Sequence, residues 1–163
     1  MRILKILLIL LLSGYVQSEE FSDSKENYSG VIMNFEKCET DKLGILKVDV
    51  YRYADGKEPK AAWNLTRRAL CGRSSGDIRY VMSHMSPNAT VSTVNEFGEE
   101  ELTVFRESDE RLRLFGVSEG GVYIYKNDDG INVSIDAGIC GYGLRMIYVG
   151  NDWNISNFGG GCD

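Results

Sequence analysis

The sequence predicts a mostly β protein: an antiparallel β-sandwich or a barrel-like meander with one short helix, with an α+β fold as the alternative. Three observations lead to this prediction. Apolar and polar residues alternate in several short segments. Glycine, proline, asparagine and aspartate interrupt these segments at short, regular intervals. Four cysteines accompany N-glycosylation motifs, a combination typical of disulfide-linked extracellular domains.

The first 18 residues have the pattern of a secretory signal peptide. Arg2 and Lys5 precede an apolar run, Ile6 to Leu12, and we expect cleavage after Ser18. The run is shorter than the roughly 20 residues that cross a bilayer, so an uncleaved anchor is the weaker alternative. We therefore expect a signal peptide over 1–18, a polar leader with a first strand over 19–37, and a single disulfide-linked β domain over 38–163.

Asparagine-linked glycosylation motifs are more frequent than chance allows. Random placement of the Asn, Ser and Thr residues gives about one N-x-[ST] motif in this chain, yet it has several. The acceptors are Asn27, Asn64, Asn88, Asn132 and Asn154. Such a chain is expected to meet the glycosylation machinery of a eukaryotic secretory pathway and to be secreted.

The charge of the chain argues against two classes of partner. Removal of Arg2 and Lys5 with the signal peptide takes the formal net charge from −6 to −8. An acidic protein of this kind is not expected to bind nucleic acid or an anionic membrane, and a basic ligand suits it better. The sequence leaves the oligomeric state open.

The cysteines predict two disulfides, because an even number in an oxidising compartment indicates complete pairing. They are Cys38, Cys71, Cys140 and Cys162. Three pairings are possible. We prefer the local one, Cys38 with Cys71 and Cys140 with Cys162, because it also ties down the glycine-rich tail. Without a CxxC motif or a second histidine, no metal site is expected.

The segment after Cys38 predicts a strand and then a helix. Leu46, Val48 and Val50 alternate with polar residues, and Ala54-Asp55-Gly56 is a turn signal. Pro59 suits a first helical turn and Gly72 suits the exit from the helix. On that helix a polar arc of Lys60, Asn64, Arg67 and Arg68 faces away from an apolar side of Ala61, Ala62, Trp63, Leu65, Ala69 and Leu70.

A meander of strands is predicted for the rest of the chain. The candidate strands lie near 78–85, 90–97, 101–107, 110–117, 121–127, 130–136 and 143–150, and turn residues separate them. The glycines around Cys140 and at 159–161 are interpreted as bends and a mobile end.

The register of two hairpins follows from the need to keep apolar side chains on one face. A loop at 118–120 pairs Leu114 with Ile124, and a loop at 127–130 pairs Ile124 with Val133 and Tyr125 with Asn132. The other face then carries Arg113, Phe115, Tyr123, Tyr125, Asn132 and Ser134. Because Asn132 is a glycosylation acceptor, we expect this face in water, and Arg113, Phe115, Tyr123 and Tyr125 form a candidate binding surface. Cross-strand aromatic pairs that only stabilise the sheet are the alternative. Lys60, Arg67 and Arg68 are a second candidate.

Catalytic motifs are absent from the sequence. It has no GxSxG, HExxH, GxxxxGK[ST] or GxGxxG motif, and a single histidine excludes mechanisms that need two. His84 is placed at a strand end on the same face as Tyr80 and Met82, where packing is its expected role. No catalytic, cofactor-binding or metal-binding residue is therefore proposed, and no cofactor is expected.

Two segments resemble a known family. Gly44-Ile45 with the alternation after Cys38, and 130–136 with Cys140 four residues on, are similar to strand segments of the secreted poxvirus immune-evasion glycoproteins. That resemblance implies an acidic β-sandwich that binds host chemokines or cytokines. The resemblance does not assign a binding residue of that family to any position of this sequence.

These observations favour a secreted, N-glycosylated, non-enzymatic protein that binds an extracellular protein, with an immunomodulatory role implied by the resemblance. A secreted carrier of a small ligand or lipid is the alternative, and a packed interior would argue against it. A hydrolase with an unrecognised site and a structural matrix role are the remaining hypotheses.

Overall fold

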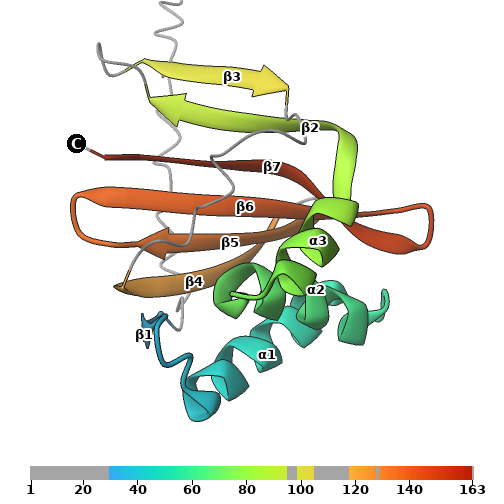
Figure 1. The fold of residues 1–163 in the computed structure, drawn as a ribbon. Helices are drawn as coiled ribbons and strands as arrows, with labels where there is room; N and C mark the ends of the chain where they lie inside the picture. The colour runs from blue at the N-terminus through green and yellow to red at the C-terminus, as the bar shows by residue number, and fades with distance from the viewer. Residues whose placement is uncertain (1–29, 95–98, 105–117, 128, 163) are drawn as a thin grey trace, which may run out of the picture.

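The fold is α+β, the alternative that the sequence allowed, rather than a sandwich or barrel with one helix. The computed structural model describes residues 30–94, 99–104, 118–127 and 129–162. Within these ranges, three helices come between the first strand and the other six, and all of these strands join one sheet. Figure 1 shows the helices together on one side of this sheet.

The sheet is mixed. Its spatial order is β1-β4-β5-β6-β7-β2-β3. The strands are β1 Val31–Asn34, β2 Met85–Val94, β3 Glu100–Val104, β4 Glu119–Asn127, β5 Gly130–Asp136, β6 Cys140–Val149 and β7 Asp152–Cys162. All neighbours are antiparallel except β2 and β7, which run parallel. The chain reaches β2 only after the helices, which explains how a strand from the first half of the chain lies beside the last one.

The first helix, α1 Thr40–Ala54, replaces the strand predicted around Leu46. Leu43, Leu46, Val50 and Ala54 are buried at helical spacing, whereas Val48 remains 59% exposed. The three-residue alternation at Leu46, Val48 and Val50 is thus too short to distinguish a strand from a helix. The predicted turn is correct, because the helix ends at Asp55 with the left-handed φ of 52°.

The second helix, α2 Pro59–Cys71, confirms the helix prediction at both ends. Pro59 lies in its first turn and Gly72 follows it as the C-cap. Ala62, Leu65, Ala69 and Leu70 are buried, as the predicted apolar side requires.

The third helix, α3 Ser75–Ser83, stands where a strand was predicted from residue 78. The overlooked signal is a capping box. Ser74 accepts a hydrogen bond from the Asp77 backbone nitrogen, and the Asp77 carboxylate accepts one from the Ser74 backbone nitrogen. The side-chain hydrogen bond from Ser74 is the largest cause that lowers the pKa of Asp77, and the charge of Arg68 adds to it. Arg68 also bridges α2 to α3 through a 2.9 Å ion pair with Asp77.

The sheet confirms most of the predicted meander and adds one strand. β2, β3, β4, β5 and β6 overlap the predicted segments near 90, 101, 121, 130 and 143, whereas 110–117 lies outside the described residues. The tail interpreted as a mobile end is β7, paired with both β6 and β2. An added side chain at Gly159 would collide with Ser92, and one at Gly160 would collide with Tyr142. These glycines therefore let β7 fit between its neighbours.

The register predicted for one hairpin is correct. Ile124 pairs with Val133 and Tyr125 pairs with Asn132 across β4 and β5. On the other edge of β4, Val31 of β1 pairs with Val122. The predicted partners of that edge, Arg113, Leu114 and Phe115, lie outside the described residues.

The cysteines form the two local pairs. Cys38 and Cys71 have Cα atoms 5.9 Å apart and join the entrance of α1 to the end of α2. Cys140 and Cys162 are register partners at one end of β6 and β7, with Cα atoms 4.0 Å apart. Both pairs are at disulfide distance, one in the helix layer and one in the sheet.

The core lies between the helices and the covered face of the sheet. Helix residues Leu46, Leu65 and Leu70 are fully buried, as are Val122, Ile131 and Met146 of the sheet. Trp153 closes one end, because its indole nitrogen donates a 2.6 Å hydrogen bond to the carbonyl of Lys57 in the loop between α1 and α2.

Candidate functional site

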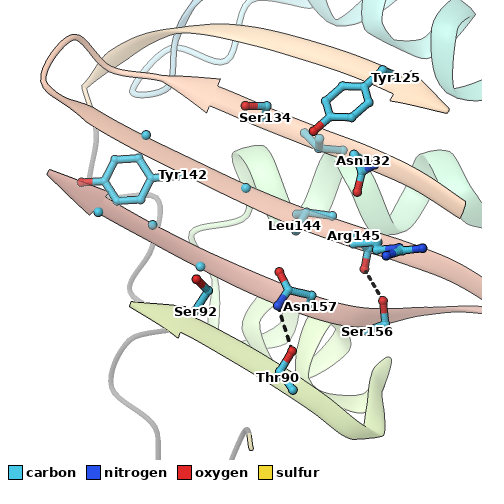
Figure 2. A pocket seen from close by; sticks show the side chains of 16 residues that line it. Thr90, Ser92, Tyr125, Asn132, Ser134, Tyr142, Leu144, Arg145, Ser156 and Asn157 are labelled. Atoms are coloured by element: carbon cyan, nitrogen blue, oxygen red, sulfur yellow. Dashed lines mark hydrogen bonds between the residues drawn. The ribbon is translucent and has the colours of Figure 1, made fainter. Parts of the chain in front are cut away.

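A hollow of about 760 Å³, lined by polar and apolar surface in equal measure, occupies the face of the sheet that the helices leave uncovered. We call it the open-face hollow. It is lined by Thr90, Ser92, Tyr125, Asn132, Val133, Ser134, Gly141, Tyr142, Gly143, Leu144, Arg145, Ser156, Asn157, Gly159, Gly160 and Gly161. Figure 2 shows the side chains of its central strands on the near side of the sheet, with helices behind. Its size falls in the range of small-molecule sites.

Asn132 is the most unusual residue of the hollow. Its side chain is only 8% exposed, and its Nδ2 has no hydrogen-bond partner among the described residues. Tyr125 and Arg145 are its cross-strand neighbours on either side. Leaving a buried donor unpaired costs about 1–3 kcal/mol, so the group calls for an explanation.

Arg145 has a second unpaired donor beside the first. Its Nε is buried without a partner in the described part of the chain. Its Nη2 is used, because it donates to the carboxylate of Asp129. This hydrogen bond is the largest cause that lowers the pKa of Asp129, with the positive charge of Arg145 adding to it. The guanidinium is therefore held at its outer end, while its buried Nε has no partner among the described residues.

Much of the rest of the lining consists of hydroxyl groups, amide groups and the backbone of glycines. Asn157 Nδ2 donates a 2.8 Å hydrogen bond to the hydroxyl of Thr90, and the Ser156 hydroxyl donates to the carbonyl of Arg145 at 3.4 Å. Gly143 lies between Ser134 and Gly159 in the register. The hollow exists in part because Gly141 and Gly143 fill none of it.

The predicted aromatic surface is only partly described. Arg113 and Phe115 lie outside the described residues, whereas Tyr123 and Tyr125 are both half-buried on the open face. Tyr125 lines the hollow. The ring of Tyr123 lies against Gly30 and Gly121 instead, at the edge of the sheet, where an added Cβ would crowd it.

The helices leave this face of the sheet uncovered, as expected, but Asn132 itself is only 8% exposed between its cross-strand neighbours Tyr125 and Arg145. A residue can thus lie on an uncovered face and still be buried by its cross-strand neighbours.

The glycosylation acceptors differ in exposure. Asn88 is exposed, and Asn27 lies outside the described residues. Asn64 is half-buried, and its Oδ1 accepts a hydrogen bond from Arg68 Nε at 3.2 Å. Asn154 is also half-buried, and its Nδ2 donates to the carbonyls of Val149 and Asp152. Asn132 is the least accessible of the four described acceptors.

The basic arc on α2 is not one continuous surface. Lys60 and Arg67 are exposed. Arg68 is engaged, because it pairs with Asp77 and lies 4.5 Å from the centre of the Tyr80 ring. The arc therefore supports the contact between α2 and α3 as well as facing solvent.

His84 lies at the C-cap of α3, so its predicted place at a strand end was wrong. Its ring stacks on Tyr80, with ring centres 4.1 Å apart. Ser83 and Asp152 are both close, at 3.2 Å from Nδ1 and 3.7 Å from Nε2. However, Nδ1 is 2.7 Å from the Tyr80 carbonyl, which also accepts the Ser83 hydroxyl proton. Nδ1 must donate to that carbonyl, so it cannot act as a base toward Ser83.

The described residues contain neither a metal-binding cluster nor a membrane-spanning helix. No three His, Cys, Asp or Glu side chains gather there in a way that could hold a metal ion. No helix in the same part of the chain has the length and apolar character needed to cross a membrane.

Sequence reasoning missed Arg145 and Asn157, which lie opposite one another on β6 and β7. One signal could have found them. Glycine alternates at 141 and 143 on β6, and again at 159 and 161 on β7. Alternate positions share a face, so this pattern predicts a strip without side chains beside Arg145 and Asn157.

Comparisons with known proteins give no family. No protein-family model matches the chain, and no curated protein matches it. One solved structure to which the chain shows a weak similarity is an NTF2-like protein of unknown function from Shewanella baltica. It is 14% identical, the similarity covers 75% of this chain and 94% of that chain, and the TM-score is 0.33. The function must therefore be inferred from the residues of this chain.

Proposed function

We propose that this chain is a secreted, N-glycosylated, non-enzymatic protein that binds an extracellular protein through the open face of its sheet. The observation that carries the proposal is the buried, unpaired amide of Asn132 in the open-face hollow. A partner that presents a hydrogen-bond acceptor there would satisfy a donor that the chain leaves unpaired.

Secretion is supported by three features of the chain. They are the signal-like segment over 1–18, the repeated N-x-[ST] motifs and the two cysteine pairs at disulfide distance. The formal charge of −8 after cleavage favours a basic partner over an acidic one.

The lipid-carrier alternative receives less support. A carrier needs an empty apolar cavity, whereas the apolar side of this sheet is packed under the helices, with Ile131 and Met146 fully buried. The open-face hollow lies on the opposite face, is open to solvent, and is lined by polar and apolar surface in equal measure. The enzyme hypothesis gains nothing from His84, whose Nδ1 and neighbouring serine both donate to one carbonyl.

Affinity capture from extracellular fluid tests the proposal. The tagged mature protein should retain a partner, and Gly143→Val should reduce capture at least tenfold because valine would occupy the hollow. A Cβ at Gly143 would be 3.4 Å from the carbonyl of Val133, an ordinary contact, so the variant should fold.

Gly44→Ala is the matched control, because Gly44 is exposed on α1 with open space around it. Equal capture by the parent and by Gly143→Val would exclude the hollow as the binding surface.

A further inference from the structure

The open-face hollow has little net charge. Among the residues that line it, Arg145 alone is charged, and its guanidinium is paired with Asp129. Because Arg145 lowers the pKa of Asp129, this carboxylate remains ionised at neutral pH and the pair persists. The other polar side chains of the lining are uncharged hydroxyls and amides. A charged ligand would therefore meet no unpaired charge of opposite sign in the hollow.

The two unpaired groups specify what the ligand must supply. Asn132 Nδ2 and Arg145 Nε are both donors, and their residues are register partners on adjacent strands. Directly opposed residues in antiparallel strands lie roughly 5 Å apart, so the two donors belong to one small region of the hollow. The ligand atoms that meet them must be acceptors, and the hydroxyl of Ser134, two residues along β5 on the same face as Asn132, can either donate or accept.

We propose that the hollow binds a neutral sugar residue. This inference rests on the proposed function and deepens it: the extracellular partner would be recognised through a carbohydrate group. Once a side-chain rotation exposes the two buried donors, adjacent hydroxyl oxygens of a sugar ring accept from Asn132 and Arg145, and a hydroxyl proton of the sugar remains available to the Ser134 oxygen. Tyr125 at one end of the hollow adds an aromatic face with a polar tip (Figure 2).

The sugar comes from another molecule rather than from Asn132 itself. Nδ2 is the atom to which an N-linked glycan attaches, and here it is buried. A glycan on this atom would displace Tyr125 or Arg145, the two residues that flank it. The recognised sugar is therefore a free oligosaccharide or a glycan of the partner.

A glycan array of neutral oligosaccharides beside their sialylated and sulfated counterparts tests this inference on the mature protein. Binding is expected to the neutral members. Asn132→Asp should weaken it at least tenfold, because a nearly isosteric carboxylate replaces the donor with an acceptor. Asn127→Asp is the control, since it adds the same charge at an exposed position of the same hairpin. Gly143→Val should weaken binding as strongly through occlusion, which provides a second variant if Asn132→Asp fails to fold.

The outcomes separate the two proposals. Binding to anionic glycans alone, or binding that survives both Asn132→Asp and Gly143→Val, would overturn the neutral-sugar inference. Absence of binding to any glycan would overturn it as well, while capture of a protein partner sensitive to Gly143→Val would still support the proposed function. If an enzymatically deglycosylated partner is still captured, the sugar on that partner is not the recognised group. Competition by a free neutral oligosaccharide would support the inference.

Discussion

The two faces of the sheet differ most clearly along β5, where neighbouring residues point in opposite directions. Ile131 and Ile135 are at most 1% exposed and pack under the helices, whereas Asn132 and Ser134 face the hollow. The covered face contributes apolar burial, which stabilises the fold. The open face contains an unpaired buried amide, which costs stability. We infer that the covered face maintains the structure and that the open face serves binding.

Each layer also has its own crosslink, and reducing both should produce the largest loss of stability. The pairs close loops of 33 and 22 residues, so the loop-entropy model gives about 3–4 kcal/mol for each. Denaturant unfolding with and without reductant measures the loss. Thiol titration of the denatured, unreduced protein should find no free cysteine; two or more free thiols would refute the model of a disulfide-linked secreted domain.

Adjacent positions of β5 test the difference between the faces directly. Ile131→Ala should cost about 2–5 kcal/mol because it leaves a cavity under the helices. Ser134→Ala should change stability by about 0.5 kcal/mol or less, as surface substitutions do. Comparable losses from the two substitutions, measured by urea unfolding, would show that the faces are not distinct.

A smaller effect is expected in the helix layer alone. Ser74→Ala removes the capping box of α3 and should cost about 1 kcal/mol. Because Ser74 lowers the pKa of Asp77, the contribution of that carboxylate is present above its ordinary value of 3.8 and is lost as the pH falls through the lowered pKa. The difference in the free energy of unfolding between parent and variant should therefore be larger at neutral pH than at acidic pH, as unfolding curves at the two pH values would show. Weaker ligand capture by Ser74→Ala at neutral pH would contradict the separation of the two layers.

The smallest predicted change in stability is a gain. Gly44→Ala in the interior of α1 should raise the free energy of unfolding by about 0.5–1 kcal/mol, since alanine favours the helix and a Cβ there meets nothing within 4 Å. Thermal unfolding of the parent and of Gly44→Ala measures this gain. A loss of stability would indicate that α1 is not helical at this position.

Site occupancy by mass spectrometry adds a test that needs no substitution. Asn88 is exposed and should carry a glycan, whereas Asn132 is buried and should be unmodified. Complete modification of Asn132 would be incompatible with ligand binding in the open-face hollow, because the attached glycan would fill the space that the ligand needs.

The sequence predicted the structure correctly where a pattern was long or where two independent signals agreed. The helix from Pro59 has both a start and a stop signal, and the hairpin of β4 and β5 has one register that keeps Ile124 and Val133 on the same face. At Leu46 and Val48 the alternation was too short to exclude a helix. Propensity arguments also missed β7, since its glycines are needed only because β2 and β6 lie so close to it.

The hollow was less predictable than the fold. Tyr125 and Asn132 could be placed on one face from the register, but Arg145 and Asn157 approach them only through pairing of β6 and β7. The burial of Asn132 depends on Tyr125 and Arg145 together, which belong to strands on either side of it. Such three-strand arrangements follow from the topology, and the parallel pairing of β2 with β7 had no signal in the sequence.

Footprinting of the captured complex tests the central claim most directly, because it asks which face of the native protein the partner covers. Hydroxyl radicals label exposed tyrosine and aliphatic side chains, and the free and bound proteins can be compared by mass spectrometry. Binding should protect Tyr125 on the open face and leave Ile45 and Val48 on the exposed side of α1 unchanged. Protection of Ile45 and Val48 with no change at Tyr125 would place the partner on the helix layer and contradict the account.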